Sequence, residues 1–280
     1  MKIVKVERRG QTAEGIVEGD AVKIIGAWLD GVAESAAFSL SRQPLATLES
    51  LASGATETVA LDEVTLAVPI DPLARIMCVG MNYRDHVSEI KLEVAPNPTI
   101  FTRTLDSLVA PGQSIIRPRV SEKFDFEGEI AVIIGREGRH VRREDAMDHV
   151  GGYSCFLDGS VRDYQKHSLT AGKNFWRTGS MGPWIVTADE FGVADALLET
   201  RLNGTTVQSA HASQMIFDIP AIIEYLSRMM VLRPGDVIAT GTPGGVGARR
   251  DPPLWMRAGD RTEVEVEGIG TLRNAVVDER

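Results

Sequence analysis

Residues 124–135 carry the clearest pattern in the chain, because apolar and acidic side chains alternate there with the period of two of a β-strand. One face comprises Phe124, Phe126, Ile130, Val132 and Ile134. The other face begins with Asp125, Glu127 and Glu129 and continues with Ala131 and Ile133. A strand that is apolar on both faces is buried, and neighbouring buried carboxylates need a cation or hydrogen-bond donors. A solvated strand end is the simpler explanation, but the apolar run that follows makes a cation site at least as well supported.

Shorter runs of the same kind recur along the chain, separated by turns that contain glycine and proline. From residue 76 onward these strand-like runs are 76–79, 99–102, 129–134, 152–157, 184–187, 236–240 and 262–267. Helical periodicity is clearest at 44–52 and at 213–230, where Pro220 predicts a kink or two separate helices. Because no regular helix separates each pair of strands, a doubly wound sheet and a (β/α)₈ barrel are disfavoured. We therefore predict an α+β fold that is mainly β.

The pattern changes near residue 70, where Pro69, Asp71 and Pro72 interrupt it. The preceding part has short strand-like segments, glycine-rich turns and the 44–52 helix, but no cluster of chemically reactive side chains. We predict a small N-terminal α/β domain over residues 1–70 and a larger second domain over residues 71–280.

Composition restricts the class of partner. The 280 residues carry a formal net charge of −9, which argues against binding to a phosphate backbone, so we expect no nucleic-acid partner. A local basic pocket for a small anion is still compatible with that charge. The sequence has neither a signal-peptide pattern nor an apolar run of membrane-spanning length, so we expect a cytoplasmic protein with no membrane partner. Cys78 and Cys155 lie in separate apolar runs and are expected to be buried thiols.

Asp158 is a further carboxylate candidate, because it ends an apolar run and precedes a polar segment. If a helix began there, Arg162 and Gln165 would share a face with Asp158. On this segment alone, a helix cap with an ion pair is the commoner explanation. Together with Glu127 and Glu129, however, Asp158 forms a set of carboxylates without a His or Cys partner, which suits a hard cation. Mg²⁺ is the first choice, Mn²⁺ and Ca²⁺ are further candidates, and Zn²⁺ is disfavoured.

His86 and Glu89 stand three residues apart in a polar segment that follows the run 76–79. On one helical turn they would be neighbours, and a carboxylate can orient an imidazole that takes a proton from water. An incidental pair on a surface helix is the alternative, and without further context it is preferred.

Lys173 and a glycine-rich run at 239–247 are the remaining candidates. Lys173 is either a solvated loop lysine or a partner for an enolate or carboxylate. The run at 239–247 lacks the Gly-Lys-Ser/Thr ending of a P-loop and matches no dinucleotide fingerprint. It is a tight turn, or a cradle in which backbone N–H groups and Thr242 bind an anion.

Five ordered motifs, which span about residues 74–275, resemble the fumarylacetoacetate hydrolase family. They are Cys-Val-Gly-x-Asn-Tyr-x-x-His-x-x-Glu from residue 78, Phe-Asp-Phe-Glu-Gly-Glu from residue 124, Asp-Gly-Ser-Val-Arg-Asp-Tyr-Gln from residue 158, Gly-Pro-Trp-Ile-Val-Thr-Ala-Asp-Glu from residue 182 and Pro-Gly-Asp-Val-Ile-Ala-Thr-Gly-Thr-Pro-Gly-Gly-Val-Gly from residue 234. The resemblance implies a mixed β-roll catalytic domain, usually dimeric, with a divalent cation at its centre.

The resemblance also implies residue roles. The implied metal ligands are Glu127, Glu129 and Asp158, and the implied catalytic residues are Lys173 and the water-activating pair His86 and Glu89 on a mobile lid. The implied substrate contacts, besides Lys173, are Tyr83, Arg162, Gln165 and Thr242.

Three positions depart from the family pattern. Thr102-Arg103-Thr104 replaces a Lys-Pro pair of many relatives, Gly159 replaces a Val, and 174–177 is variable. These residues border the expected pocket and leave the exact substrate open.

The main functional hypothesis is a hydrolase that cleaves a C–C bond in a 2,4-diketo acid or acylpyruvate. Water activated by His86 would attack, and the metal and Lys173 would stabilise the leaving pyruvate enolate. Oxaloacetate decarboxylation, or isomerisation of a related keto acid, would use the same enolate without the attacking water. A non-catalytic protein with a structural cation is the alternative from another class, and the His86–Glu89 pair argues against it. In the enzyme hypotheses we expect a homodimer acting on a small anionic keto acid.

Overall fold

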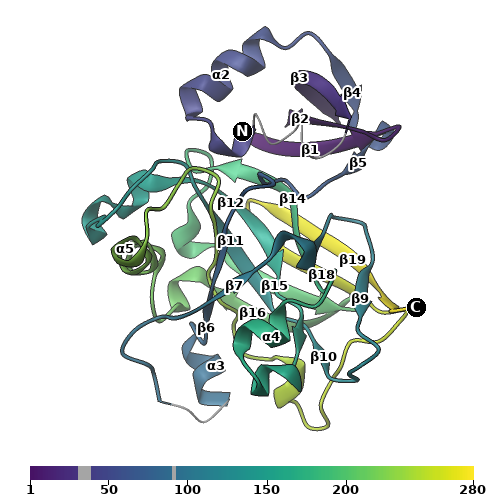
Figure 1. The fold of residues 1–280 in the computed structure, drawn as a ribbon, viewed down its shortest axis with the longest axis vertical. Coiled ribbons are helices and arrows are strands. Elements are labelled where there is room, and N and C mark those ends of the chain that lie inside the picture. The colour runs from purple at the N-terminus through teal and green to yellow at the C-terminus, as the bar shows by residue number, and fades with distance from the viewer. Residues whose placement is uncertain (31–38, 90–92) are drawn as a thin grey trace.

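The computed structural model describes residues 1–30, 39–89 and 93–280, and its architecture is mainly β (Figure 1). The strands before the long central hairpin are β1 (Lys2–Arg8), β2 (Gln11–Glu18), β3 (Ala21–Asp30), β4 (Thr58–Ala60), β5 (Thr65–Leu66), β6 (Ile76–Gly80), β7 (Thr99–Arg103), β8 (Leu108–Val109), β9 (Ile115–Arg117) and β10 (Phe124–Asp125). The later strands are β11 (Gly128–Ile134), β12 (Val150–Leu157), β13 (Ser160–Val161), β14 (Gly179–Thr187), β15 (Leu197–Leu202), β16 (Thr205–His211), β17 (Val237–Ala239), β18 (Arg261–Val266) and β19 (Gly270–Asp278).

Helices are short and few by comparison. The α-helices of the described ranges are α2 (Leu45–Gly54), α3 (Arg84–Glu89), α4 (Leu169–Lys173) and α5 (Ile219–Met229). The 3₁₀-helices are η1 (Leu40–Arg42), η2 (Leu61–Glu63), η3 (Leu105–Ser107), η4 (Arg143–His149), η5 (Tyr164–Lys166), η6 (Val193–Asp195), η7 (Ala212–Gln214) and η8 (Gly247–Arg249). No helix of these ranges is long and apolar enough to cross a membrane. The mainly β, α+β prediction is confirmed.

The described strands form three sheets. The largest has twelve strands, with the order β4-β3-β2-β1-β14-β12-β11-β17-β6-β7 and with β5 and β8 attached to β1 and β14. A second sheet has the order β16-β15-β18-β19-β9, and it packs against the β14, β12 and β11 region of the first. The third is the short pair β10 and β13.

Strand β11 is buried on both faces, as its alternation predicts. Ile130 and Val132 belong to a core shared with the five-stranded sheet and with α5. Ala131 and Ile133 face the other way, into a second core that also contains Leu48 of α2. Every residue of β11 is therefore buried, including Glu129. A carboxylate placed here needs compensating charge or donors.

The prediction of one strand over 124–135 is wrong at a single point. The chain leaves the strand after β10 and re-enters it as β11, and its partner breaks at the matching place between β12 and β13. Between the two breaks, the amide of Asp158 donates to the carbonyl of Glu127 at 2.8 Å. The two paired segments thus bend together, which brings Glu127 opposite Asp158 at the corner.

Two helix predictions are also resolved. The helix at 44–52 is confirmed as α2. The 213–230 stretch is not one kinked helix, because η7 is followed by an irregular link and then by α5. Pro220 lies in the first turn of α5, where its missing N–H has no intrahelical acceptor to lose, and the Asp218 side chain caps the helix by accepting from Ala221.

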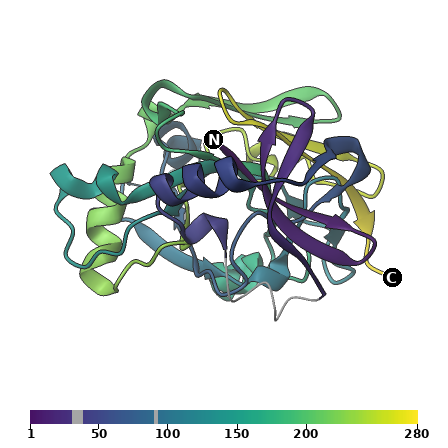
Figure 2. The same ribbon diagram turned by 90° about the horizontal axis from the view of Figure 1, so that it is seen from above.

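The N-terminal strands and α2 cover one end of the molecule (Figures 1 and 2). Strand β1 continues the large sheet by pairing antiparallel with β14, Lys2 opposite Val186 and Ile3 opposite Ile185. The division at residue 70 remains a prediction. Both cysteines are buried free thiols, as expected.

Candidate metal centre and active site

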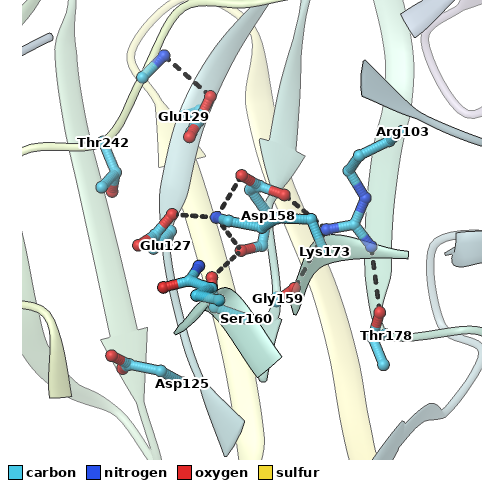
Figure 3. Close-up of polar contacts among 12 residues, drawn as sticks. Arg103, Asp125, Glu127, Glu129, Asp158, Gly159, Ser160, Lys173, Thr178 and Thr242 are labelled. Atoms are coloured by element: carbon cyan, nitrogen blue, oxygen red, sulfur yellow. Dashed lines mark hydrogen bonds and ion pairs between the residues drawn. The ribbon is translucent and has the colours of Figure 1, made fainter. Parts of the chain in front are cut away.

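Three carboxylates meet at the corner of the bent hairpin (Figure 3). Glu127 lies in the bend, Glu129 is the second residue of β11, and Asp158 directly follows β12. Each offers an oxygen, and these oxygens lie within 4.8 Å of one another. All three side chains are buried, Asp158 completely. The sequence-based grouping of these residues is therefore reproduced in three dimensions.

Two cations enclose Asp158 from opposite sides (Figure 3). Lys173, the last residue of α4, contacts Oδ2 of Asp158 at 2.5 Å and also pairs with Glu127. Its side chain is buried, so it is not the solvated loop lysine of the alternative interpretation. On the other side, Nη1 of Arg103 donates to Oδ1 of Asp158 at 2.5 Å. Neither the helix start nor the Arg162 pairing expected at Asp158 is present, because the chain enters β13 there.

Arg162 instead bridges two acidic residues of the neighbouring strand segment. Its Nη2 lies 2.7 Å from Oδ2 of Asp125 and 2.6 Å from Oε1 of Glu127, while Nη1 donates to Oε1 of Gln165 at 3.1 Å. Asp125 is therefore not part of the metal-ligand group. It fixes the guanidinium of Arg162 at the edge of the site, and Arg162 and Gln165 lie together as the sequence suggested.

The buried charged groups shift one another's pKa values, some upward and some downward. Burial raises the pKa of Glu127, but Arg162 and Lys173 outweigh it and bring the pKa to about 2. Burial and the adjacent charge of Asp158 raise the pKa of Glu129 well above its ordinary value. For Lys173, burial lowers the pKa, but Asp158 and Glu127 raise it by more. The negative charges of the three carboxylates are thus not fully compensated by the neighbouring cations.

That donor set fits a divalent cation. Glu127, Glu129 and Asp158 provide only oxygen ligands, which suits Mg²⁺ or Mn²⁺ rather than Zn²⁺. A bound cation would also relieve the repulsion that raises the pKa of Glu129. These three residues are the ones that would hold it.

In the glycine-rich loop after β17, backbone amides donate hydrogen bonds to carboxylates of the protein itself. Gly241 N donates to Glu129 at 2.8 Å, Gly245 N donates to Glu89 at 2.7 Å, and Gly247 N donates to Asp125 at 2.7 Å. The prediction that the loop amides bind an anionic ligand is therefore wrong for these three amides, because each already donates to an acidic side chain of the protein. The loop instead ties together three separate parts of the site.

Thr242 belongs to the same loop and lines the cavity above the carboxylates. Its hydroxyl donates to the Gly128 carbonyl at 2.9 Å and accepts from Gln208 at 2.8 Å. These bonds hold Thr242 beside the first residue of β11.

His86 and Glu89 lie on one turn of α3, with His86 Nδ1 3.7 Å from Glu89 Oε2. His86 is only 6% exposed, so the surface-helix alternative does not hold for its imidazole. Burial lowers the pKa of His86 more than the charge of Glu127 raises it, which favours the neutral imidazole that can accept a proton. The pair is thus assembled, while its mobility as a lid stays a prediction.

A cavity of about 770 Å³ lies over the carboxylate corner. The sequence-predicted residues that line it are His86, Glu127, Glu129, Arg162, Gln165, Lys173 and Thr242. Tyr83 is not among its lining residues: it is 1% exposed and lines a smaller pocket of about 340 Å³. Its hydroxyl has no hydrogen-bond partner in the described part of the chain. The geometry therefore gives its predicted substrate contact no support.

Arg103 and Gly159, noticed in the sequence only as departures from a pattern, are part of the site. The carbonyl of Gly159 accepts from Nη1 of Arg103 at 3.1 Å. A Cβ at Gly159 would lie 1.9 Å from the carbonyl oxygen of Thr178, so a Val has no room here. An Arg that directly follows the strand-like run 99–102 was the signal available in the sequence for Arg103, but the sequence does not identify Asp158 as its partner.

Comparison with known proteins agrees with this geometry. Residues 75–277 match the family model described as fumarylacetoacetate (FAA) hydrolase, C-terminal. The chain is 37% identical over 245 residues to the mitochondrial oxaloacetate tautomerase fahd2 of Xenopus laevis, covering 86% of this chain and 77% of that protein. It is 41% identical over 223 residues to the oxaloacetate tautomerase YisK of Bacillus subtilis, covering 77% of this chain and 74% of that protein.

A solved structure extends the comparison to the whole chain. Maleylpyruvate hydrolase from Sphingobium sp. SYK-6, in complex with manganese(II) ion and pyruvate, superimposes with a TM-score of 0.81 at 29% identity, covering all of both chains.

Proposed function

The chain belongs to the fumarylacetoacetate hydrolase family, and on that basis we propose that it is a metal-dependent enzyme that interconverts the enol and keto forms of a small 2-keto acid such as oxaloacetate. The single observation that carries the proposal is the buried corner of Glu127, Glu129 and Asp158 beneath a cavity that also presents His86 and Lys173. The naming of two relatives as oxaloacetate tautomerases supports this reaction over the C–C hydrolysis first expected. It corresponds to the keto-acid isomerisation alternative.

Each step is assigned to residues of the chain. A divalent cation held by Glu127, Glu129 and Asp158 would supply positive charge that lowers the free-energy cost of an enol at C2. Arg162 and Gln165 hold the 1-carboxylate at the edge of the site. The buried positive charge of Lys173 stabilises the negative charge that develops on the oxygen at C2.

His86 moves the proton at C3. Its Nδ1 faces Glu89, which leaves Nε2 for the substrate. In the enol-to-keto direction, Nε2 of the neutral imidazole accepts the proton of the C2 hydroxyl and then gives a proton to C3, so that substrate and imidazole end with the number of protons with which they began. Closing the cavity around these groups would exclude water from the exchange.

Hydrolysis of an acylpyruvate is the second candidate, and the assembled His86–Glu89 pair favours it because such a pair can activate water. The two reactions differ in product. The test follows loss of the enol absorbance of oxaloacetate, and pyruvate release from oxaloacetate and from acetylpyruvate, with Mg²⁺, with Mn²⁺ and after chelation. We expect rapid metal-dependent enol loss without pyruvate. Brisk pyruvate release from acetylpyruvate, with no effect on the enol, would replace the proposal by hydrolysis.

Magnesium as the native metal, a homodimer and a cytoplasmic location remain predictions. Metal analysis of the purified protein and light scattering would test the first two.

A further inference from the structure

Gln208 is a buried amide on β16, the edge strand of the five-stranded sheet, and it is 2% exposed. Its neighbour Val207 is buried as well, so the in-and-out alternation of β16 is interrupted here. The interruption coincides with an irregular register against β15, where Gln208 lies opposite Thr200 but Thr206 lies opposite Arg201. A bulge of this kind re-aims side chains, and a buried amide is costly unless its polar atoms are hydrogen-bonded. The partners of Gln208 therefore decide what it does.

The amide of Gln208 completes a ring of three hydrogen bonds with Gly128 and Thr242. Gly128 N donates to Oε1 of Gln208 at 3.0 Å, Nε2 of Gln208 donates to Oγ1 of Thr242 at 2.8 Å, and that hydroxyl donates to the Gly128 carbonyl at 2.9 Å. Nε2 also donates to the Pro243 carbonyl at 3.0 Å. Because a backbone N–H only donates and a carbonyl only accepts, these partners fix the orientation of the amide.

The ring takes the place of a strand partner for the first residue of β11. On one edge of β11, β17 pairs with residues 131–133, and Thr240 N still donates to the Ile130 carbonyl at 3.0 Å. Gly128 is two residues before Ile130, so its backbone groups face the same edge, where β17 has already ended. The ring bonds these groups instead. The neighbouring strand β15 also restricts the position, because a Cβ on Gly128 would lie 2.0 Å from Oγ1 of Thr200.

The ring bears on the metal-binding carboxylates because Gly128 separates Glu127 from Glu129. Its N–H belongs to the peptide unit shared with Glu127, and its carbonyl belongs to the peptide unit shared with Glu129. Fixing both peptide units fixes the directions in which the two acidic side chains leave the backbone. Through the Pro243 carbonyl, Gln208 also holds the glycine-rich loop, whose amide at residue 241 donates to Glu129 at 2.8 Å.

We propose that Gln208 is a positioning residue of the metal site, which sets the spacing and direction of Glu127 and Glu129. The inference rests on the divalent cation of the proposed function. Gln208 itself does not line the cavity, so it acts through these two carboxylates. Mg²⁺ demands near-ideal octahedral geometry, whereas Ca²⁺ accepts flexible arrangements of oxygen ligands. Loss of Gln208 should therefore weaken the binding of Mg²⁺ more than that of Ca²⁺, whereas a general loss of stability would leave the ratio of the two affinities unchanged.

The test is calorimetric titration of the full chain with Mg²⁺ and with Ca²⁺, combined with melting curves. Gln208→Met keeps the length of the side chain and removes its polar atoms. Thr242→Val breaks the same ring at another bond, and it carries the test if Gln208→Met does not fold. Asn274→Leu is the matched control. Asn274 is 4% exposed on β19 of the same sheet, and its Nδ2 donates to the carbonyls of Ala110 and Gln113, which do not line the cavity.

We expect Gln208→Met and Thr242→Val each to weaken Mg²⁺ binding by about 10-fold to 100-fold and to lower the ratio of Mg²⁺ to Ca²⁺ affinity. The double variant should lose far less than the product of the two single losses, because either change opens the ring. Asn274→Leu should lower the melting temperature and keep both affinities. An unchanged ratio in the two ring variants would overturn the inference, as would an equal fall of the ratio in Asn274→Leu or single losses that multiply in the double variant.

Failure of this inference is distinguishable from failure of the proposed function. If the wild type binds Mg²⁺ and turns over oxaloacetate while the ring variants keep its affinity ratio, only the role of Gln208 is wrong. If the wild type binds neither cation and does not turn over oxaloacetate, the proposed function fails and this inference fails with it.

Discussion

Arg103 and Asp158 form an ion pair whose two side chains are completely buried, with Nη1 of Arg103 2.5 Å from Oδ1 of Asp158. The rest of the guanidinium is also bonded: Nε and Nη2 donate to Ser107, Nη2 donates to Thr178, and Nη1 donates to the carbonyl of Gly159. A planar fork of donors is needed for this set of partners, and a lysine could not supply it. The pair therefore holds in place one oxygen of Asp158, a member of the carboxylate group that could bind a metal.

Removing Arg103 should destabilise the metal-free protein strongly, because Oδ1 of Asp158 would remain buried without its cationic partner and only Lys173 would still pair with the carboxylate. For Arg103→Met we expect a loss of roughly 3–5 kcal/mol in the free energy of unfolding. Mg²⁺ should restore part of the lost stability by neutralising Asp158. The stability of Arg103→Lys should lie between those of the wild type and Arg103→Met. Urea unfolding with and without Mg²⁺ measures this, with the exposed Arg119→Met as control. Equal stability of Arg103→Met and the wild type in chelator would contradict it.

Removing one carboxylate of the corner should remove the metal. In Glu129→Gln we expect that Mg²⁺ and Mn²⁺ no longer raise the melting temperature and that turnover is lost, because the variant keeps only two of the three acidic ligands. The exposed Glu137→Gln should behave as the wild type does. A metal-dependent rise in melting temperature that persists in Glu129→Gln would exclude this residue as a ligand.

Replacing His86 should separate reactions by their need for proton transfer. His86→Ala should lower tautomerisation, and any acylpyruvate hydrolysis, by roughly 10²–10⁴-fold, while oxaloacetate decarboxylation falls much less. The exposed His140→Ala is the control. Tautomerisation at the wild-type rate in His86→Ala would exclude His86 as the proton carrier.

The pH profile provides a second test of His86. Its neutral form is the base, and burial lowers its pKa below the ordinary 6.5. Activity should therefore persist at pH 6.5 and decline only as the pH falls through that lowered value. A decline in kcat/KM centred above pH 7 would contradict this assignment.

A valine at position 159 should not fit this chain. Its Cβ would lie 1.9 Å from the Thr178 carbonyl oxygen and 3.2 Å from the Phe124 ring. We expect Gly159→Val to cost at least about 1–3 kcal/mol in stability. Gly192 has an extended backbone, and no atom lies within 4 Å of the place that a Cβ would take there, so Gly192→Val is the matched control. Thermal unfolding of both variants should show a large loss only for Gly159→Val.

Asp125 should act through Arg162 rather than on the substrate. Asp125→Asn keeps the shape but weakens the contacts with Arg162 and with the amides of Gly247 and Ala248. We expect KM to rise by at least about tenfold with a smaller change in kcat, and stability to fall by about 1–3 kcal/mol. Steady-state kinetics and melting curves test this. A fall in kcat alone, at constant KM, would argue against a positioning role.

The sequence by itself determined several of the central strands and the three carboxylates that form the acidic corner. Alternation at 129–134 indicated a strand buried on both faces, and Ile130 and Ile133 do pack into two different cores. Such predictions succeed because the period of a strand, and the cost of burying carboxylates, are properties of neighbouring residues.

Only the tertiary structure decided which charges meet. Asp125 and Glu127 look equivalent in the sequence, but the bend after β10 sends Asp125 to Arg162 and to the glycine-rich loop, away from the metal-ligand group. Arg103 is 55 residues from Asp158, and nothing in the local pattern of either residue names the other. The physical reason is that long-range pairings depend on strand order and on bends in the sheet, which bring together residues that no local period relates.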